Sequence, residues 1–118
     1  MPLMNFIKKE PISKGWSCDQ KFCVTAQDNT KYLLRITPFE KSAERSDMFR
    51  MQQKVASLDI PMCRPVEMGE CEDGVYILQT WIDGEDGENV IPGLPDTKQF
   101  EYGLEAGRIL CRIHSIPA

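Results

Sequence analysis

The sequence predicts an α+β fold, in which a five-stranded antiparallel sheet carries one helix and is followed by a hinge linker and a C-terminal helix. Three observations predict this fold. Short β-prone runs alternate with clusters of turn residues. One stretch of helical periodicity interrupts these runs, and a second follows the last of them. The chain has 118 residues, 42% of them hydrophobic and 27% charged, which suffices for one domain with one core.

The first part of the chain predicts a three-stranded antiparallel meander. Residues 4–12 form a lead-in, and residues 11–36 are typical of strand, Gly-containing loop, strand, tight turn and strand. The turn at residues 27–30 contains Asp and Asn, which tolerate unusual backbone angles. Arg35 lies inside the last strand, where a half-buried cation needs an anionic partner. That partner is either a carboxylate of the protein or a phosphate of a ligand.

The middle of the chain predicts a helix and an edge strand. Apolar residues recur at helical spacing over residues 40–58. Pro61 ends this helix, because proline disfavours a helical conformation in the residue before it. An edge strand that contains a proline is predicted at residues 62–68, and a hairpin turn at residues 70–74.

The last part predicts a buried strand and a second helix. Residues 75–82 form a nearly continuous apolar run, which favours a central strand covered on both faces. The acidic loop 83–88 follows, and Asp96 is expected to be the N-cap of the last helix. Gly103 and Gly107 lie within that helix, and each costs about 1 kcal/mol relative to alanine. Either that side packs closely against another backbone, or the cost is tolerated.

Composition argues against several classes of function. Five cysteines without a Cys-x-x-Cys pair, and His114 as the only histidine, disfavour a disulfide framework or a metal site and favour a reducing cytoplasm. No apolar run has transmembrane length, and no dense basic patch with interleaved aromatics is present. Neither a membrane nor nucleic acid is therefore expected as a partner. The net charge of −4 is unevenly spread, which suits a ligand that carries both charges, two ligands of opposite charge, or an ordinary solvated surface.

Five segments of the sequence carry a resemblance to a known family. They are residues 12–17, 32–36, 58–61, 75–85 and 106–114. In this order they resemble the N-terminal lobe of the aminoglycoside phosphotransferase family, which comprises small-molecule kinases with the protein-kinase-like fold. The resemblance covers essentially the whole chain. It implies a kinase-like N-terminal lobe over residues 1–83, an acidic hinge linker over residues 84–96, and the first helix of a missing C-terminal lobe over residues 97–118.

The resemblance also implies which residues hold the phosphates of a nucleotide. The loop over the nucleotide would consist of Ser13, Lys14, Gly15, Trp16 and Ser17. Arg35 matches the third-strand lysine that binds the α- and β-phosphates, and its guanidinium suits phosphate oxygens although its reach differs. The helix glutamate that orients this cation falls near Met48, so the adjacent Asp47 is the expected replacement. The alternatives are that Arg35 only pairs with a helix carboxylate and that the loop lysine is merely solvated.

At the hinge, the resemblance implies contacts to adenine. Gln79 would guard the back of the pocket. Thr80 and Ile82 would offer a backbone carbonyl and N–H group to the base, with Trp81 between them. The alternative for Trp81 and Ile82 is plain core packing.

By the same resemblance, the cofactor is ATP or GTP with Mg²⁺. The family places the metal ligands and the catalytic loop, His-x-Asp-x-x-x-x-Asn, on a later lobe. Neither that motif nor Asp-Phe-Gly occurs in this sequence, and His114 is expected to be structural. We therefore assign no catalytic residue and no metal ligand, and we expect the chain alone to be inactive as a phosphotransferase.

The substrate and the partners are expectations of the same kind. The acidic stretch 83–88 would help to attract a cationic substrate such as an aminoglycoside, with a role in antibiotic resistance, and choline-like or sugar substrates remain open. The alternative function is a non-catalytic nucleotide-binding or protein-interaction module of the same fold. The apolar side of the last helix is expected to fold back on the sheet or to pair with a second copy in a homo-oligomer.

Overall fold

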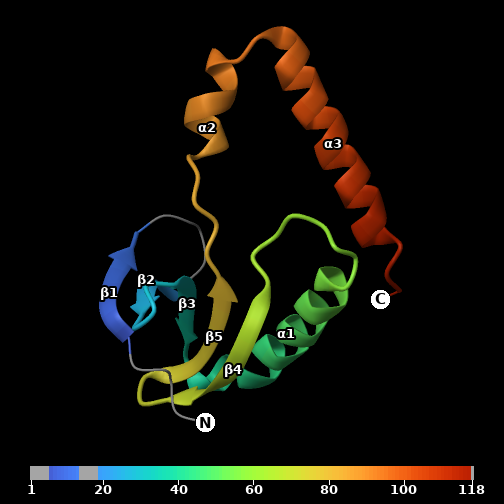
Figure 1. Cartoon of the computed structure of the whole chain (residues 1–118). Coiled ribbons are helices and arrows are strands. Elements are labelled where there is room, and N and C mark those ends of the chain that lie inside the picture. The colour runs from blue at the N-terminus through green and yellow to red at the C-terminus, as the bar shows by residue number, and fades with distance from the viewer. Residues whose placement is uncertain (1–5, 14–18, 118) are drawn as a thin grey trace.

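Five antiparallel strands form one strongly curved sheet in the order β1-β2-β3-β5-β4, with a helix on one side and a long arm beyond it (Figure 1). The computed structural model describes residues 6–13 and 19–117. The strands are β1 (Phe6–Ile12), β2 (Gln20–Ala26), β3 (Lys31–Thr37), β4 (Pro65–Cys71) and β5 (Gly74–Thr80). The helical elements are η1 (Phe39–Lys41), α1 (Ser42–Ala56), α2 (Gly87–Val90), η2 (Ile91–Gly93) and α3 (Asp96–His114). The predicted α+β architecture is confirmed.

Two strand boundaries differ from the prediction. The expected lead-in is itself the edge strand β1, and its Phe6 packs against the core. The edge strand expected from residue 62 begins at Pro65, because the chain still bends after α1. Pairing with β5 is established at Arg64, whose carbonyl accepts the Thr80 N–H at 2.9 Å.

Side chains point alternately to the two sides of each strand, and this gives the sheet two different faces. One face holds the apolar core, a buried cluster made of Val24, Leu34, Ile36, Tyr76 and Leu78. Leu34 lies opposite Leu78 across the β3–β5 ladder, so these side chains share one side of the sheet. Because the side-chain period of a strand is two, Arg35 and Thr37 lie on the opposite face, toward α1.

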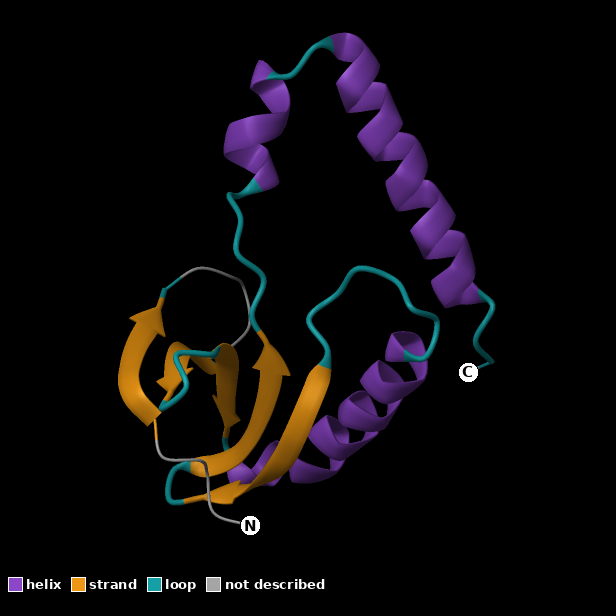
Figure 2. Ribbon diagram, viewed as in Figure 1, coloured by secondary structure: helices purple, strands orange, loops and turns teal. Residues whose placement is uncertain are grey.

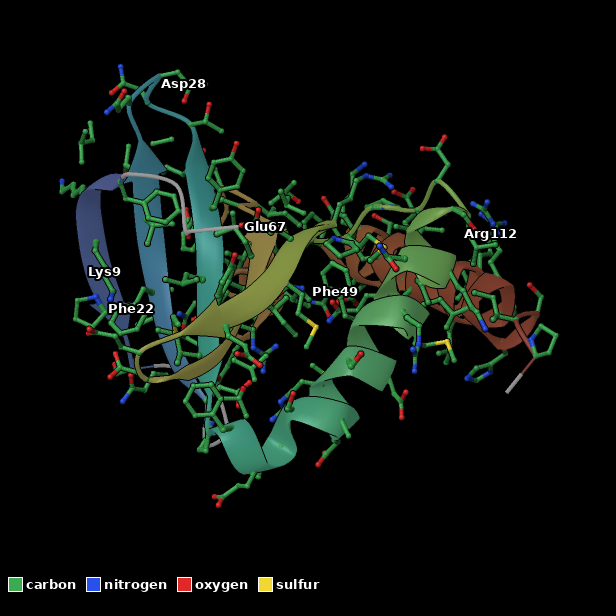
Figure 3. The ribbon with its side chains drawn as sticks, turned by 90° about the horizontal axis from the view of Figure 1, so that it is seen from below. Lys9, Phe22, Asp28, Phe49, Glu67 and Arg112 are labelled. Atoms are coloured by element: carbon green, nitrogen blue, oxygen red, sulfur yellow. The ribbon has the colours of Figure 1, made fainter. Side chains whose placement is uncertain are left out.

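On the core face, a cation of β1 lies over an aromatic ring of β2. The Lys9 ammonium lies 4.3 Å from the centre of the Phe22 ring, and both residues are labelled in Figure 3. On the α1 side of the sheet, the same view shows Phe49 between the helix and β4. Every residue from Gly74 to Gln79 is buried, so the prediction of a central strand covered on both faces is confirmed for β5.

A buried phenol joins β5 to β4 on the core side. Tyr76 donates a hydrogen bond from Oη to a Glu67 carboxylate oxygen at 2.8 Å. Burial, this hydrogen bond and the charge of Glu67 raise the pKa of Tyr76 to about 12. The phenol therefore stays neutral and stays a donor across the physiological pH range.

The C-terminal arm stands away from the sheet. Figure 2 shows the chain leaving β5, forming the short α2, and returning through α3 toward the far end of α1. Most α3 side chains are exposed, so the expectation that α3 folds back on the sheet is wrong. The Arg112 guanidinium donates to the Leu58 carbonyl after α1. No helix in the described part of the chain is both long and apolar enough to cross a bilayer.

The structure decides between the two alternatives for the glycines of α3, and it corrects the predicted N-cap. A Cβ added at Gly103 or Gly107 would meet no described atom within 4 Å, so close backbone packing does not explain these residues. Asp96 is the first helical residue rather than the N-cap, a position that Pro95 takes. The Gln99 side-chain amide instead donates to the Leu94 carbonyl at 2.9 Å and ties the first turn to the preceding loop.

Replacement of Gly74 by alanine tests the junction between the β4–β5 turn and β3. Gly74 has a φ of +149°, and an added Cβ would lie 2.1 Å from the Thr37 carbonyl oxygen. We expect Gly74→Ala to lower the free energy of unfolding by about 3 kcal/mol, measured by urea denaturation. The control is Gly84→Ala, since Gly84 has open space around it and should change stability by less than about 0.5 kcal/mol. Equal stabilities of the two variants would contradict this account of the turn.

Candidate functional site

Arg35 is held on the α1 side of the sheet by the carboxylate of Asp19. The Arg35 Nε and Nη2 atoms lie 3.2 Å and 3.0 Å from Asp19 Oδ2. Asp19 occupies the bend directly before β2, and its side chain is only 1% exposed. The Arg35 side chain is 22% exposed, so the cation is half-buried but still reaches the surface. Of the two partners left open by the sequence, the structure thus provides a carboxylate of the protein.

The second carboxylate oxygen of Asp19 joins β3 to α1. Asp19 Oδ1 accepts hydrogen bonds from Thr37 Oγ1 at 2.8 Å and from Arg45 Nη2 at 2.9 Å. Arg45 belongs to α1 and also donates from Nε to Thr37 Oγ1 at 3.2 Å. We refer to Asp19, Arg35, Thr37 and Arg45 as the Asp19 cluster. The start of β2, the end of β3 and the first turns of α1 meet in it.

The Asp19 cluster carries one negative and two positive charges. Burial by itself would raise the pKa of Asp19, but the Thr37 hydrogen bond and the charges of Arg45 and Arg35 outweigh it. The pKa of this carboxyl therefore lies below its ordinary value, and Asp19 is ionised at neutral pH. One positive charge remains in excess at a site shielded from water. Such a site favours an anion, and a guanidinium matches phosphate oxygens well.

Asp47 does not take part in this arrangement. Its side chain is 73% exposed and pairs with Arg50, one turn further along α1. The predicted pairing of Asp47 with Arg35 is therefore wrong, and Asp19 supplies the carboxylate instead. The physical reason is that Asp47 lies on the solvent side of α1, whereas Arg45 and Met48 lie on the inner side.

Sequence reasoning missed Asp19 and Arg45, although one signal could have found the first of them. The β2–β3 hairpin pairs Gln20 with Ile36 and Lys21 with Arg35. Continuing that register by one residue places Asp19 opposite Thr37, beside Arg35. Counting outward from the predicted turn at residues 27–30 would have given the same pairing. No comparable pattern in the sequence indicates Arg45, because it depends on how α1 docks.

The predicted hinge residues follow one another along the end of β5. Gln79 is 5% exposed and lies opposite Leu33, on the same face of the sheet as Arg35. Its Oε1 atom is buried and accepts no hydrogen bond from any described group. A buried acceptor without a donor costs free energy, so this atom is suited to a donor on a ligand.

The next three residues are less buried than Gln79. Thr80 Oγ1 accepts the Arg64 N–H at 2.7 Å. Trp81 is half-buried and donates from Nε1 to Asp83 at 3.0 Å. Ile82 is exposed, so the alternative of core packing does not hold for this residue.

The predicted nucleotide loop is described only at its edge. Ser13 follows β1 and is exposed. Lys14, Gly15, Trp16 and Ser17 lie outside the described residues. Their contacts with a nucleotide, like those of Arg35 and the hinge residues, stay a prediction.

Family comparison adds an independent observation. Residues 9–118 match the phosphotransferase enzyme family. The chain belongs to that family. The match covers almost the whole sequence, and it confirms the resemblance drawn from the five sequence segments. Comparisons with curated proteins and with solved structures found no match.

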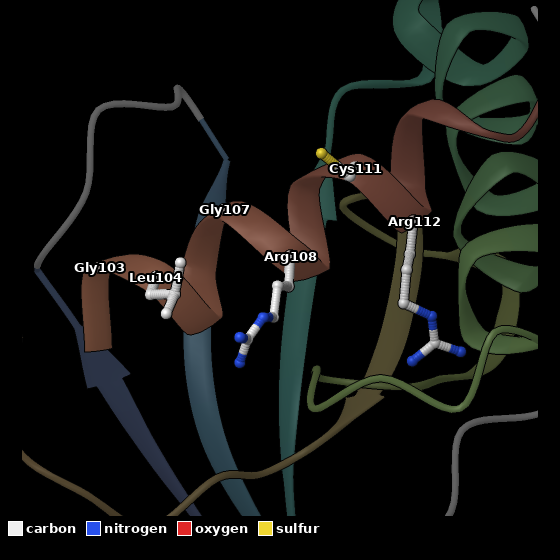
Figure 4. Close-up of a pocket in the computed structure, with 6 residues that line it drawn as sticks. All are labelled: Gly103, Leu104, Gly107, Arg108, Cys111 and Arg112. Atoms are coloured by element: carbon white, nitrogen blue, oxygen red, sulfur yellow. The ribbon is translucent and has the colours of Figure 1, made fainter. Parts of the chain in front are cut away.

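In this phosphotransferase-family chain, a hollow of about 620 Å³ lies along α3, outside the Asp19 cluster. Figure 4 shows the residues that line it, which are Gly103, Leu104, Gly107, Arg108, Cys111 and Arg112. None of them belongs to the Asp19 cluster or to the predicted hinge. The two glycines present no side chain, which leaves this side of the helix low and open.

The depressed pKa of Asp19 leads to a pH-dependent contribution to stability. A carboxyl with a lowered folded-state pKa stabilises the fold fully above the unfolded value of about 3.9 and loses that contribution as the pH falls through its folded value. We expect Asp19→Asn to lower the free energy of unfolding by about 3 kcal/mol at pH 7, because it leaves two guanidiniums without their anion. The difference from wild type should shrink as the pH falls below about 4.

Urea unfolding at pH 7 and at pH 3 measures this difference. The control is Glu44→Gln, which removes an exposed carboxylate from α1 beside Arg45. It should change stability by less than about 0.5 kcal/mol at pH 7. A destabilisation by Asp19→Asn that is the same at both pH values would show that the charge of Asp19 does not stabilise the fold.

Proposed function

We propose that this chain is the nucleotide-binding lobe of an ATP- or GTP-dependent small-molecule phosphotransferase of the aminoglycoside type. The observation that supports it most is Arg35, a strand cation fixed by a buried carboxylate on the sheet face that also carries Gln79. Membership of the phosphotransferase family makes a nucleotide phosphate the natural anion for this cation.

The charge balance of the Asp19 cluster supports binding of phosphates. Two guanidiniums share one carboxylate, so the cluster keeps a net positive charge when Asp19 is ionised. Charges in a partly desolvated site interact more strongly than in bulk water. In this proposal, Mg²⁺ bound with the nucleotide neutralises charge on its phosphates, and the metal ligands belong to the C-terminal lobe of the family.

The base is proposed to lie against the end of β5. The buried Oε1 of Gln79 would accept a hydrogen bond from the base, and the backbone of Thr80 and Ile82 would hold its edge. The division into a lobe over residues 1–83, a linker over residues 84–96 and a helix over residues 97–118 belongs to the same proposal. The exposed acidic residues of the linker suit a cationic acceptor substrate.

One observation favours the second candidate, a non-catalytic nucleotide-binding or interaction module. The arm exposes large apolar side chains on α3, including Phe100 at 71%, Leu104 and Leu110. Exposed apolar side chains in this number are typical of a surface that another protein surface covers. A second copy of the chain would give the predicted homo-oligomer.

Replacement of Arg35 tests nucleotide binding directly. We expect the wild-type chain to bind Mg·ATP or Mg·GTP, and Arg35→Ala to weaken that binding by roughly 10- to 100-fold, the value of one or two charge-assisted hydrogen bonds. Isothermal titration calorimetry measures the affinities. Arg50→Ala is the matched control, because Arg50 is an exposed arginine that pairs only on the surface of α1. No binding by the wild-type chain, or equal binding by Arg35→Ala, would overturn the proposal.

The 118-residue chain is expected to bind the nucleotide without transferring its phosphoryl group. Its only histidine, His114, is followed by Ser115 and Ile116, so the family's catalytic loop is not encoded in it. Incubation with labelled ATP, Mg²⁺ and an aminoglycoside, choline or a sugar should give no labelled product. A labelled product that depends on Arg35 would contradict this expectation and make the chain itself an enzyme.

A further inference from the structure

We propose that Asp19 is a positioning residue that aims Arg35 at the phosphates of the nucleotide, and that Arg45 holds Asp19 in place from α1. The inference rests on the proposed function, since it concerns the same nucleotide site. It assigns to a residue directly before β2 the orienting task that was expected of a helix carboxylate. It also gives α1 a basic rather than an acidic contribution to the site.

The first step is the division of the Asp19 carboxylate between two tasks. Oδ2 contacts only Arg35 among the described residues, along the Nε–Nη2 edge of the guanidinium. Oδ1 contacts Thr37 and Arg45. One oxygen therefore fixes the plane of the cation that reaches the surface. The other anchors the carboxylate to the body of the domain.

The second step distinguishes the two arginines. The Arg45 side chain is 11% exposed, and each of its three nitrogen atoms has a protein partner. Nε donates to Thr37, Nη2 to Asp19, and Nη1 lies 3.6 Å from the Met48 sulfur atom. Each nitrogen atom of Arg45 is thus occupied by a contact within the protein. Arg35 is the more exposed guanidinium, so it is the one that can meet a ligand.

The third step concerns Thr37, which makes the arrangement rigid. Its hydroxyl donates to Asp19 and accepts from Arg45, so the three groups form a closed ring of hydrogen bonds. Thr37 itself is 3% exposed and lies on β3, two residues beyond Arg35. Positioning groups act in this way when their own rotamers are locked by packing and hydrogen bonds. A shift of α1 or of the start of β2 would therefore turn Arg35.

The test compares a ligand that carries phosphates with one that does not. In the full 118-residue chain, Asp19→Asn should weaken Mg·ATP binding at least roughly 10-fold while leaving the affinity for adenosine unchanged, both followed by NMR titration. Arg45→Lys keeps the positive charge but loses the planar guanidinium. It should weaken Mg·ATP binding to a smaller extent, again with the affinity for adenosine unchanged. Glu44→Gln, which removes an exposed carboxylate next to Arg45, should bind both ligands as the wild type does.

The outcomes separate this inference from the proposed function. Equal Mg·ATP affinity in Asp19→Asn and wild type, or equal loss for ATP and adenosine, would overturn the positioning role. If Asp19→Asn does not fold, the same criteria apply to Arg45→Lys.

Failure of the wild-type chain to bind Mg·ATP would overturn the proposed function and leave Arg35 no phosphate to meet, whereas the fixing of Arg35 by Asp19 is tested separately in the ligand-free protein. The Arg35 Nε–H resonance should exchange slowly with water in the wild type and faster in Arg45→Lys. Unchanged exchange would overturn the inference even without a nucleotide.

Discussion

The buried carboxylate of Asp19 is the interaction on which the arrangement of this domain depends. A charge that is 1% exposed is tolerated only while its partners are in place. Those partners come from β3 and from α1, while Asp19 itself lies directly before β2. The cost of an unpaired charge therefore links the docking of the helix to the pairing of the first hairpin. The helix α1 contributes no residue to the buried apolar cluster of β2 and β3, so this ionic contact couples it to both strands.

The alternation of β3 explains how a core and a polar site coexist on a single strand. Leu34 and Ile36 point into the apolar cluster, while Arg35 and Thr37 point toward α1. A slip of one residue in register would put the guanidinium in the core and the leucine on the face toward α1. The apolar side thus fixes the register, and the register fixes the position of Arg35. The alternation of apolar and polar side chains along β3 therefore serves both the stability of the core and the proposed phosphate binding.

Much of the fold follows from local patterns, whereas the site follows only in part. The continuous apolar run of β5 and the helical periodicity of α1 are local signals, and both elements exist as predicted. Arg35 stood out because a cation is unusual in a strand. Its carboxylate was misassigned to Asp47, because proximity along a helix suggested a contact that the side of the helix forbids. Arg45 could not be found, since only tertiary docking brings α1 to Asp19. For Gly103 and Gly107 the sequence left close packing and a tolerated cost open, and the structure shows no described atom packed closely against them.

The position of α3 has a consequence for the lifetime of the chain. A 19-residue helix with almost no tertiary contact receives little stability beyond its own backbone hydrogen bonds. Its opening costs far less free energy than the unfolding of the sheet, so the two parts do not melt as one unit. Proteases and chaperones recognise frayed apolar segments, and α3 presents one without any global unfolding. Cleavage is therefore expected to begin in the arm, while the sheet and its buried carboxylate remain folded.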